Sequence, residues 1–268
     1  MARRCAAAGA KVAVVTRPVV IVTGASRPAG IGAAIAVALA ADGWDVAITS
    51  WTPYDGTRPW RATSGSDPGA VVAAVEAAGA RAVHVEADLA DPSVPAQVFE
   101  RAEALGPVTG LVVNHCESTD SGLYDTTVES FDRHHAVNVR ATWLLLRELG
   151  LRFPDGATSG RAVTLTSDHV VGNLPYGATK AAANAVALAA AAELGTKGIT
   201  VNAVNPGPTD TGWFTPEVTA HVVAQTMLPR QGETADVARL VRFLLSADGG
   251  WVTGQLLYSN GGFRPTLT

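Results

Sequence analysis

The stretch "PVVIVTGASRPAGIGAAIAVALAADG" (18–43) decides the expected fold. Its first residues, 18–24, are apolar and β-branched, which predicts a buried strand, and the small apolar residues over 30–43 predict a helix. The glycine-rich turn "TGASRPAGIG" (23–32) connects the two. Glycine permits a positive φ and a close approach of the backbone, and the N–H groups at a helix start attract phosphate. The turn therefore predicts a phosphate-binding loop, or else an ordinary strand-to-helix turn.

The same alternation of strand and helix continues to the end of the chain. The expected strands cover 45–50, 81–87, 109–114, 161–167, 199–205 and 254–259, and the expected helices cover 69–78, 92–105, 127–150, 176–195 and 234–246. Strands of this kind form a mainly parallel sheet with helices on both faces, because their crossovers are right-handed. We therefore expect an α/β, doubly wound Rossmann fold.

The length of the chain suits a single domain. No low-complexity linker divides the 268 residues, and the Pro- and Gly-rich stretch over 51–69 predicts a surface loop. We expect one domain over 18–268, preceded by an N-terminal extension, 1–17, of unassigned role. Within that extension, 6–16 echo 39–49. Three interpretations of this similarity stay open: the extension forms an extra structural element, it is a remnant of a tandem unit, or it results from translation from an upstream start.

Composition and charge argue against several classes of protein. Hydrophobic residues make up 47% of the chain, which is enough for a substantial core. The formal net charge of −4 and the scattered basic residues argue against nucleic-acid and membrane-surface partners. No run reaches the ~18 apolar residues of a membrane span. The twin arginine near the N-terminus has no convincing cleavage site after it, so we expect a cytoplasmic protein.

Cysteine and histidine argue against a disulfide framework and a metal site. Cys5 and Cys116 are the two cysteines, they lie far apart, and no CxxC occurs, which fits a reducing compartment. The histidines are dispersed except for His134-His135, and adjacent residues of a helix point apart. We expect no catalytic metal, because no spacing of the HExxH kind is present.

A tyrosine and a lysine at the start of a predicted helix give the first indication of chemistry. In "YGATK" (176–180), Tyr176 and Lys180 lie one helical turn apart and share a face. A cationic amine favours the phenolate and so lowers the tyrosine pKa, which makes the phenol a usable proton donor and acceptor near neutral pH. A chance pair on a solvated helix is the alternative. Ser167 at the end of the preceding strand and Asn138 in the preceding long helix favour a site.

In their order and spacing, these residues resemble the short-chain dehydrogenase/reductase family over about residues 18–264. The sequence is most similar to its 3-oxoacyl-carrier-protein reductase-like branch. The shared motifs are the glycine-rich turn, "ADL" (87–89), "VVNH" (112–115), "NVRAT" (138–142), Ser167, "YGATK", "NPGPTDT" (205–211) and "WVTGQLLYSNGGF" (251–263).

The resemblance implies catalytic roles for four residues. Tyr176 would donate a proton to a carbonyl oxygen as hydride arrives from the reduced nicotinamide. Ser167 would hydrogen-bond that oxygen as its charge develops. Lys180 would hold the nicotinamide ribose and lower the pKa of Tyr176. Asn138 would anchor a water that relays protons through Lys180.

The resemblance also implies a set of cofactor-binding residues. The pair at 88–89 would lie against the adenine, Asn114 would lie near the adenosine ribose, and residues within 206–209 would flank the nicotinamide. The expected cofactor-binding residues are Gly24, Ser26, Arg27, Gly30, Ile31, Asp88, Leu89, Asn114, Tyr176, Lys180, Pro206, Gly207 and Thr209.

The glycine-rich turn departs from the usual family pattern. The family's turn is T-G-x-x-x-G-x-G, and this chain has two added residues, such as Pro28-Ala29. Expanded turns also occur in the enoyl reductase branch, but there six residues usually separate the tyrosine from the lysine. The three residues between Tyr176 and Lys180 therefore favour reduction of a carbonyl.

Two further departures concern the catalytic loop and the end of the fourth strand. Ser167 lies nine positions before Tyr176, which is a shorter spacing than usual, and Thr164 has nearer the usual spacing but falls inside the strand. Asp168-His169 after the serine would tune the site or cap the loop. The family's N-N-A-G is replaced by larger residues over 113–116, at the place where the backbone of the family approaches the cofactor near Asn114.

The end of the second strand bears on cofactor choice. NAD is usually selected by an acidic residue there, which holds the ribose 2′-OH. This chain has Ser50-Trp51 at that place, and Asp55 lies too far along to assign. Arg27 would meet a 2′-phosphate, or is a solvated loop residue. We therefore expect NADP(H) in preference to NAD(H).

The sequence predicts an oxidoreductase that reduces a ketone to a secondary alcohol. Candidate substrates are 3-oxoacyl thioesters and polyketide-like carbonyls, free or carrier-bound, and 212–232 would form an apolar lid over them or pack on the body. Two alternatives stay open, namely an NAD-dependent secondary-alcohol dehydrogenase and a dinucleotide-binding sensor or scaffold with weak catalysis. By family habit we expect a homo-oligomer, a tetramer.

Overall fold

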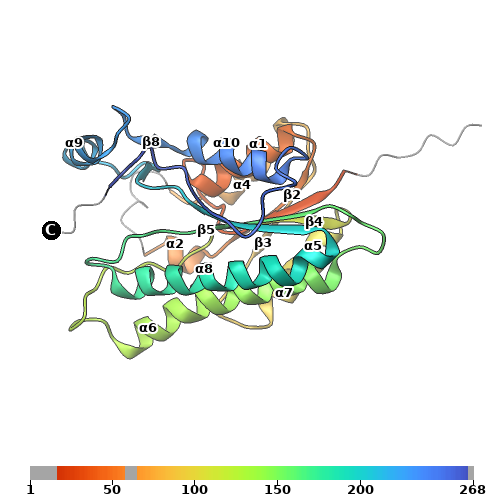
Figure 1. The fold of residues 1–268 in the computed structure, drawn as a ribbon, viewed down its shortest axis with the longest axis horizontal. Coiled ribbons are helices and arrows are strands. Elements are labelled where there is room, and N and C mark those ends of the chain that lie inside the picture. Colours follow the sequence, from red (N-terminus) through yellow and green to blue (C-terminus); the bar gives the residue numbers. More distant parts are fainter. Residues whose placement is uncertain (1–16, 58–64, 265–268) are drawn as a thin grey trace, which may run out of the picture.

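A seven-stranded parallel sheet lies at the centre of the computed structural model, which describes residues 17–57 and 65–264 (Figure 1). The strand order is β3-β2-β1-β4-β5-β6-β9. The strands are β1 (Val19–Val22), β2 (Asp45–Ser50), β3 (Ala82–Glu86), β4 (Val108–Val113), β5 (Gly160–Leu165), β6 (Ile199–Asn205) and β9 (Leu256–Tyr258). The predicted doubly wound fold is confirmed. The expected N-terminal extension lies outside the described residues, apart from Arg17.

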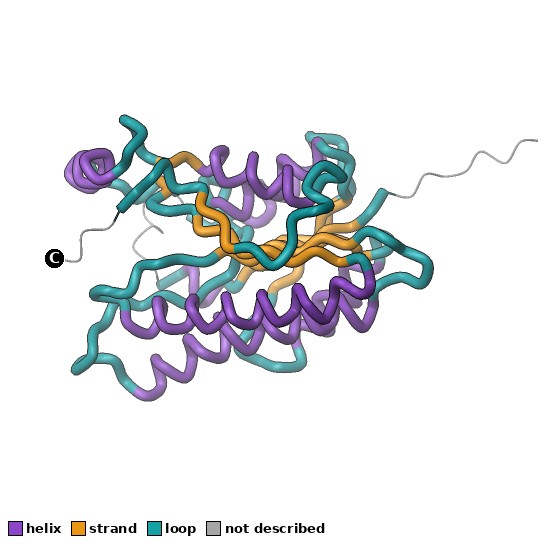
Figure 2. Tube along the Cα trace, in the orientation of Figure 1, coloured by secondary structure: helices purple, strands orange, loops and turns teal. Residues whose placement is uncertain are grey.

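Two layers of helices cover the two faces of the sheet (Figures 1 and 2). One layer holds α1 (Ile31–Ala41), α4 (Pro68–Ala77) and α10 (Thr234–Leu245). The other holds α5 (Val94–Glu103), α6 (Val128–His134), a π-helical stretch η1 (His135–Arg140), α7 (Ala141–Arg152) and α8 (Leu174–Leu194), which ends in the 3₁₀ turn η2 (Gly195–Lys197).

The strands are buried on both faces, which explains their nearly continuous apolar sequence. In β1, Val20 and Val22 pack under α1 and α10, whereas Val19 and Ile21 pack under α5 and α7, in keeping with the two-residue period of a strand. All four side chains are fully buried. Burial of each side chain stabilises the folded state by about 1.5–3 kcal/mol relative to an exposed side chain. Strand β1 is therefore anchored in the hydrophobic clusters on both faces of the sheet.

The sheet order places a crevice next to β1. Strand β1 pairs with β2 on one side and with β4 on the other, so successive crossovers leave β1 in opposite directions. In open parallel sheets, ligands bind outside the carboxyl ends of the strands at such a switch point. The loops after β1, β2, β3 and β4 meet there.

The structure departs from the expected elements in a few short segments. The expected helix over 127–150 is continuous, but its middle turn is the π-helical η1. Three elements were not predicted. Two of them are too short to show a period, and the third, a helix of ten residues, falls within the segment 212–232 that was expected as a lid. They are α2 (Thr52–Asp55), α9 (Pro216–Gln225) and a two-stranded sheet of β7 (Thr209–Asp210) and β8 (Gly232–Glu233). Among the described residues, each helix is too short or too polar to cross a membrane.

Candidate active site

The glycine-rich turn after β1 packs directly on the end of β4. Gly24 has a φ of +65°, and a Cβ there would lie 2.7 Å from the His115 Cα. A Cβ on Gly32 would lie 2.7 Å from the Asn114 amide nitrogen, which donates hydrogen bonds to the main-chain oxygens of Thr23 at 3.1 Å and Gly24 at 2.8 Å. Only glycine fits at both positions, so the turn packs tightly against the residues that follow β4.

The two added residues form the tip of this turn and leave the helix start intact. The Gly30 N–H donates to the Arg27 main-chain oxygen at 2.8 Å, which closes a turn around the exposed Pro28-Ala29. Gly30 is the N-cap of α1, no side chain caps this end, and the first turn carries no acidic residue. The free N–H groups of the first turn and the positive end of the helix dipole suit a phosphate.

A cleft of about 230 Å³ lies between this turn and the ends of β2, β3 and β4. Among its lining residues are eight of the predicted cofactor-binding residues, namely Gly24, Ser26, Arg27, Gly30, Ile31, Asp88, Leu89 and Asn114. Several lining residues were not predicted, among them Trp51, Tyr54, Asp55, His115, Cys116, Glu117, Arg133 and Thr211.

Arg133 on α6 forms ion pairs with two carboxylates of the cleft, those of Asp88 and Glu117. Its guanidinium donates to both oxygens of Asp88, at 3.1 and 3.0 Å, and to Glu117 at 3.3 Å. The hydrogen bond with Asp88, ahead of the other contacts, raises the pKa of Arg133. The sequence carries no local signal for this contact, because 45 positions separate Arg133 from Asp88.

Arg27 lies inside the cleft rather than in solvent. Its guanidinium donates to the main-chain oxygen of Thr211, across from the glycine-rich turn. Burial lowers the pKa of Arg27, and the nearby charge of Asp55 opposes that shift. Of the two readings of Arg27 from the sequence, the solvated loop residue is therefore not observed.

A buried histidine stands where the family has a small residue. His115 Nε2 contacts the Val137 main-chain oxygen at 2.9 Å, and its Nδ1 contacts the Thr23 hydroxyl at 2.8 Å. A neutral ring with its hydrogen on Nε2 satisfies both contacts. Burial, and then the nearby charge of Lys180, lower the pKa of His115 to about 3. The larger residue is thus accommodated by hydrogen bonds to the main chain and to Thr23.

The first turn of α8 brings the predicted catalytic side chains together. Helix α8 begins at Leu174, so Tyr176 and Lys180 lie one turn apart, and the Lys180 nitrogen is 5.6 Å from the centre of the Tyr176 ring. The Lys180 ammonium also donates to the Leu165 main-chain oxygen at 2.9 Å. The Ser167 side chain hydrogen-bonds the Tyr176 phenol. Thr164, the alternative to Ser167, lies within β5.

Burial dominates the electrostatics of this cluster. It raises the pKa of Tyr176 above its ordinary value. The electrostatic interactions with Cys116 and Asp168 act in the same direction, and the hydrogen bond from Ser167 opposes them. Burial also lowers the pKa of Lys180. The pKa of Tyr176 is therefore raised overall, because removal of the phenolate from water outweighs its favourable contacts, and the lowering expected from Lys180 does not decide the direction of the shift.

Asn138 lies in the π-helical turn and ties two segments together. Its amide nitrogen donates to the Glu117 main-chain oxygen and to the Thr179 hydroxyl, each at 2.9 Å. Its amide oxygen accepts from the Glu117 N–H at 2.7 Å. Thr179 is next to Lys180 on α8, so Asn138 links the loop after β4 to the catalytic helix. A π-turn often marks a functional site.

The shortened loop between Ser167 and Tyr176 packs tightly on α8. A Cβ on Gly177 would lie 2.6 Å from the His169 main-chain oxygen, and the His169 N–H donates to the Ser167 hydroxyl at 3.1 Å. Asp168 and His169 themselves are exposed. The hydrogen bond from His169 fits the interpretation of these residues as a cap of the loop.

The predicted nicotinamide-flanking residues follow β6 and stand apart from the cleft lining. Gly207 has a φ of +61°, and a Cβ there would lie 2.4 Å from the Asn260 Cβ. The Thr209 hydroxyl donates to the Pro206 main-chain oxygen at 3.1 Å. Farther along, the Trp213 and Phe214 rings pack edge to face, with their centroids 4.8 Å apart. The structure therefore does not bring 206–209 into the lining of the same cleft as the glycine-rich turn.

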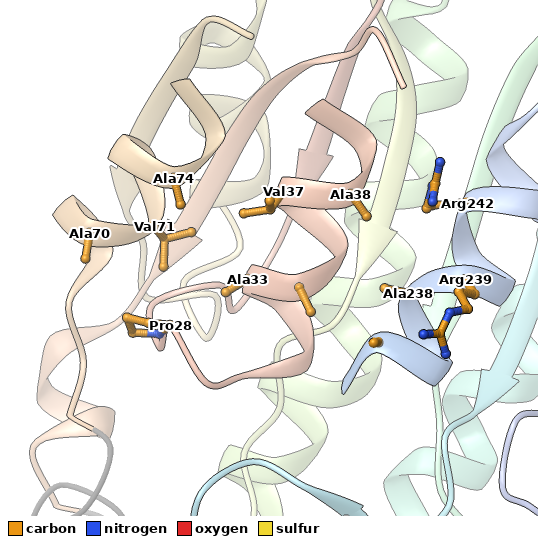
Figure 3. Close-up of a pocket in the computed structure, with 12 residues that line it drawn as sticks. Pro28, Ala33, Val37, Ala38, Ala70, Val71, Ala74, Ala238, Arg239 and Arg242 are labelled. Atoms are coloured by element: carbon orange, nitrogen blue, oxygen red, sulfur yellow. The ribbon is translucent and has the colours of Figure 1, made fainter. Parts of the chain in front are cut away.

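A second cavity, of about 400 Å³, lies on the outer side of α1 between α4 and α10 (Figure 3). Its lining is mostly alanine and valine, with Arg239 and Arg242 at one end. These arginines are paired, Arg239 with Asp236 at 2.9 Å and Arg242 with Asp42 at 2.6 Å. None of the predicted catalytic residues lines it. Within the described part of the chain, no cluster of acidic, histidine or cysteine side chains could hold a metal ion.

Comparison with known proteins identifies the family of this chain. Residues 24–264 match a family model described as enoyl-(acyl carrier protein) reductase. An NADPH-dependent aldehyde reductase 2, chloroplastic, of Arabidopsis thaliana is 38% identical over 258 residues, which cover 91% of this chain and 93% of the relative.

Two solved structures share the fold over almost the whole chain. A blue fluorescent protein from a metagenomic library, in complex with NADPH, is 36% identical with a TM-score of 0.79, covering 92% of this chain and 98% of that one. A short chain dehydrogenase from Burkholderia cenocepacia, in complex with NADP, is 35% identical with a TM-score of 0.78, covering 92% and 97%. As its motifs predicted, the chain belongs to the short-chain dehydrogenase/reductase family of oxidoreductases.

Proposed function

We propose that this chain reduces a ketone to a secondary alcohol, with NADPH as the hydride donor. The observation that carries the proposal is the cluster of Tyr176, Ser167 and Lys180 next to the glycine-lined cleft. Cys116 links the two, because it lines the cleft and interacts electrostatically with both Tyr176 and Lys180. A proton donor beside a second hydroxyl is the arrangement that carbonyl reduction requires.

The cleft residues fit a dinucleotide. The positions of Gly24 and Gly32 leave no room for a Cβ, and the uncapped first turn of α1 offers N–H groups to a pyrophosphate. Ser26, Gly30 and Ile31 belong to this cradle in the proposal.

The adenosine and nicotinamide ends of the cofactor complete this assignment. Asp88-Leu89 would contact the adenine, Asn114 the adenosine ribose, and 206–209 the nicotinamide. NADP(H) is favoured by the NADPH and NADP named in the similar proteins, and by Arg27, a half-buried cation of the lining that suits a 2′-phosphate.

The proposed chemistry assigns one task to each catalytic side chain. The reduced nicotinamide supplies the hydride. Tyr176 gives its phenolic proton to the carbonyl oxygen, and its raised pKa keeps the phenol protonated at neutral pH. Ser167 donates a hydrogen bond to the same oxygen as negative charge develops. Lys180, anchored on Leu165, binds the nicotinamide ribose.

Asn138 acts in this proposal through its neighbours. Both hydrogens of its amide are engaged, with Glu117 and Thr179, so its side chain holds the loop after β4 against α8. We expect a water chain to Lys180 to start from this region.

The substrate class rests on spacing rather than on a bound ligand. The matched family model is described as an enoyl-(acyl carrier protein) reductase, but three residues rather than six separate Tyr176 from Lys180, which favours a carbonyl substrate. A 3-oxoacyl thioester or a polyketide-like ketone, free or carrier-bound, is proposed. The segment 212–232, which includes α9, would cover it.

We further propose that the protein forms a homotetramer and works in the cytoplasm. Support for an assembly comes from large apolar side chains exposed on neighbouring helices, Trp143 and Leu151 on α7 and Leu188 on α8. Light scattering during gel filtration would measure the mass of the particle, and a monomer would contradict the proposal.

The experiment that tests the function is a fluorescence titration with NADPH and NADH, followed by turnover of a 3-oxoacyl thioester. Saturable NADPH binding together with turnover supports the proposal. Binding without turnover across ketones and alcohols would favour the sensor or scaffold. Turnover of secondary alcohols with NAD alone would favour the oxidative dehydrogenase.

A further inference from the structure

We propose that Arg133 on α6 is a positioning residue that couples the adenosine end of the cleft to the catalytic helix α8. Its guanidinium holds Asp88 on one side and the loop after β4 on the other, so a ligand that fixes Asp88 also fixes the first turn of α8. The inference deepens the proposed function and rests on it, because the contact of Asp88 with the adenine belongs to that proposal.

The Arg133 guanidinium bridges two carboxylates that come from different strands. Its two terminal nitrogens donate to the two oxygens of Asp88 at 3.1 and 3.0 Å, and its Nε donates to Glu117 at 3.3 Å. A planar fork of this kind fixes direction as well as distance, which the single ammonium of a lysine cannot do for two carboxylates. Glu117 is 7% exposed, and a carboxylate so far removed from water needs a cation beside it. Arg133 therefore fixes Asp88 relative to Glu117.

The main chain of Glu117 continues the connection toward the catalytic helix. Its N–H donates to the Asn138 amide oxygen at 2.7 Å, and its carbonyl oxygen accepts from the Asn138 amide nitrogen at 2.9 Å. The same nitrogen donates to the Thr179 hydroxyl at 2.9 Å, and that hydroxyl lies 2.8 Å from the Tyr176 main-chain oxygen. A continuous series of polar contacts thus joins Asp88 to the turn that carries Tyr176.

Helix α6 holds the loop after β4 at a second point. His134, the neighbour of Arg133, is fully buried, and its Nε2 accepts from the Thr119 N–H at 3.1 Å. Its Nδ1 lies 2.7 Å from the Ser130 main-chain oxygen, to which it donates. Helix α6 also packs beside α8 (Figure 1). The loop is therefore fixed to a rigid element, and a displacement of Arg133 is passed on to the loop.

These contacts predict a coupling between the two ends of the cleft. A ligand that orders the Asp88 side chain also orders Arg133 and, through Glu117, the hydrogen bonds of Asn138. Couplings between binding sites commonly amount to a factor of about 5–150. Local opening of the loop after β4 and of the first turn of α8 should therefore become rarer when the adenosine end alone is occupied.

The test is amide hydrogen exchange with adenosine 2′,5′-bisphosphate, which presents the adenosine end of NADPH without the nicotinamide. In wild type, we expect this ligand to slow exchange in 117–119 and in 174–180, the start of α8, by at least about fivefold. The readout needs no turnover, so it separates the coupling from the chemical step.

Two variants interrupt the connection at different points. Arg133→Lys keeps the charge but cannot bridge two carboxylates, so it should lose most of the protection of α8. Glu117→Met removes the acceptor and leaves the Arg133–Asp88 pair in place, so it should lose the same protection while it binds the bisphosphate within a few-fold of wild type. Arg239→Lys makes the arginine-to-lysine exchange at an exposed ion pair of α10 and should behave as wild type.

Kinetics with NADPH distinguish a positioning role from two simpler roles. Arg133→Lys should both raise the Kd of NADPH, measured by fluorescence titration, and lower kcat at saturating NADPH, each by about fivefold or more. A change in Kd alone would restrict Arg133 to the adenosine end, and a lower active fraction with unchanged Kd would restrict it to the fold. Either result would overturn the inference. Glu117→Met supplies the exchange comparison if Arg133→Lys does not melt cooperatively.

The inference and the proposed function fail in different ways. Wild-type protein that binds neither NADPH nor adenosine 2′,5′-bisphosphate would overturn both. Binding of the bisphosphate to wild type with no protection of 174–180 would overturn the inference alone. Full protection of 174–180 in both Arg133→Lys and Glu117→Met would also overturn it, because the coupling would then run through other contacts.

Discussion

The Lys180 ammonium nitrogen lies 5.6 Å from the centre of the Tyr176 ring, and it is held there by a hydrogen bond to the Leu165 main-chain oxygen. This relationship fixes the amine next to the phenol at the carboxyl edge of the sheet. Burial of both groups disfavours their charged forms. The phenol therefore stays protonated, in the form that can donate to a carbonyl oxygen.

The raised pKa of Tyr176 predicts the pH dependence of reduction. A proton donor is active below its pKa, and burial moves that pKa above the ordinary value of 10. We expect kcat/KM for ketone reduction to show no loss of an essential acid between pH 7 and 9.5, measured after correction for enzyme stability. A descending limb near neutral pH would contradict a protonated Tyr176.

Ser167 and Thr164 can be distinguished by matched substitutions. Ser167 bonds the phenol, whereas Thr164 lies inside β5, so Ser167→Ala should lower kcat by about 10²-fold, as expected for loss of one oxyanion donor. Thr164→Val should leave kcat within a factor of a few. A large loss of kcat in Thr164→Val but not in Ser167→Ala would show that Thr164, and not Ser167, hydrogen-bonds the carbonyl oxygen.

His115 predicts a loss of stability in acid. Its pKa is about 3 in the folded protein and about 6.5 in the unfolded chain, so below pH 6.5 the unfolded chain binds a proton that the folded protein does not. Stability is full above pH 6.5 and falls below it, by about 2 kcal/mol between pH 7 and 5 from this group alone. Urea unfolding of wild type and His115→Gln at both pH values measures the difference. If the free energy of unfolding falls equally in the two proteins between pH 7 and 5, the prediction is contradicted.

The close packing around Gly32 predicts that a larger residue there would weaken both the stability of the fold and the binding of the cofactor. A Cβ there would lie 2.7 Å from the Asn114 amide nitrogen and 2.8 Å from the Gly24 main-chain oxygen. Gly32→Ala should cost about 1–3 kcal/mol of stability and weaken NADPH binding at least about tenfold. Gly195→Ala, where an added Cβ meets open space, is the control. Tight NADPH binding by Gly32→Ala would show that the cradle does not need this glycine.

The layered fold was predictable because its signals are local. Buried strands such as β1 and β5 have Val- and Ile-rich runs, and the intervening helices are long and apolar enough to be recognised. The order of Ser167, Tyr176 and Lys180 along the chain also carried information, because a strand end and a helix start meet at the same edge of the sheet.

The remaining features depend on three-dimensional contacts that sequence periodicity does not contain. Asp55 reaches the cleft through a helix of four residues, and Arg133 meets Asp88 across 45 positions. The direction of the Tyr176 pKa shift depends on burial, which outweighs the charge pattern read from the sequence. For the same reason, the contact of Arg27 with Thr211 could not be predicted from the sequence.

The most direct test of the proposed mechanism is the turnover of Tyr176→Phe. The substitution removes one hydroxyl and keeps the ring beside Lys180, so NADPH affinity, measured by fluorescence titration, should stay near that of wild type. With NADPH and a 3-oxoacyl thioester that wild type reduces, kcat should fall by at least about 10²-fold, because the proton donor is lost. Unchanged turnover in this variant would contradict the assignment of Tyr176 as the proton donor and, with it, the proposed mechanism.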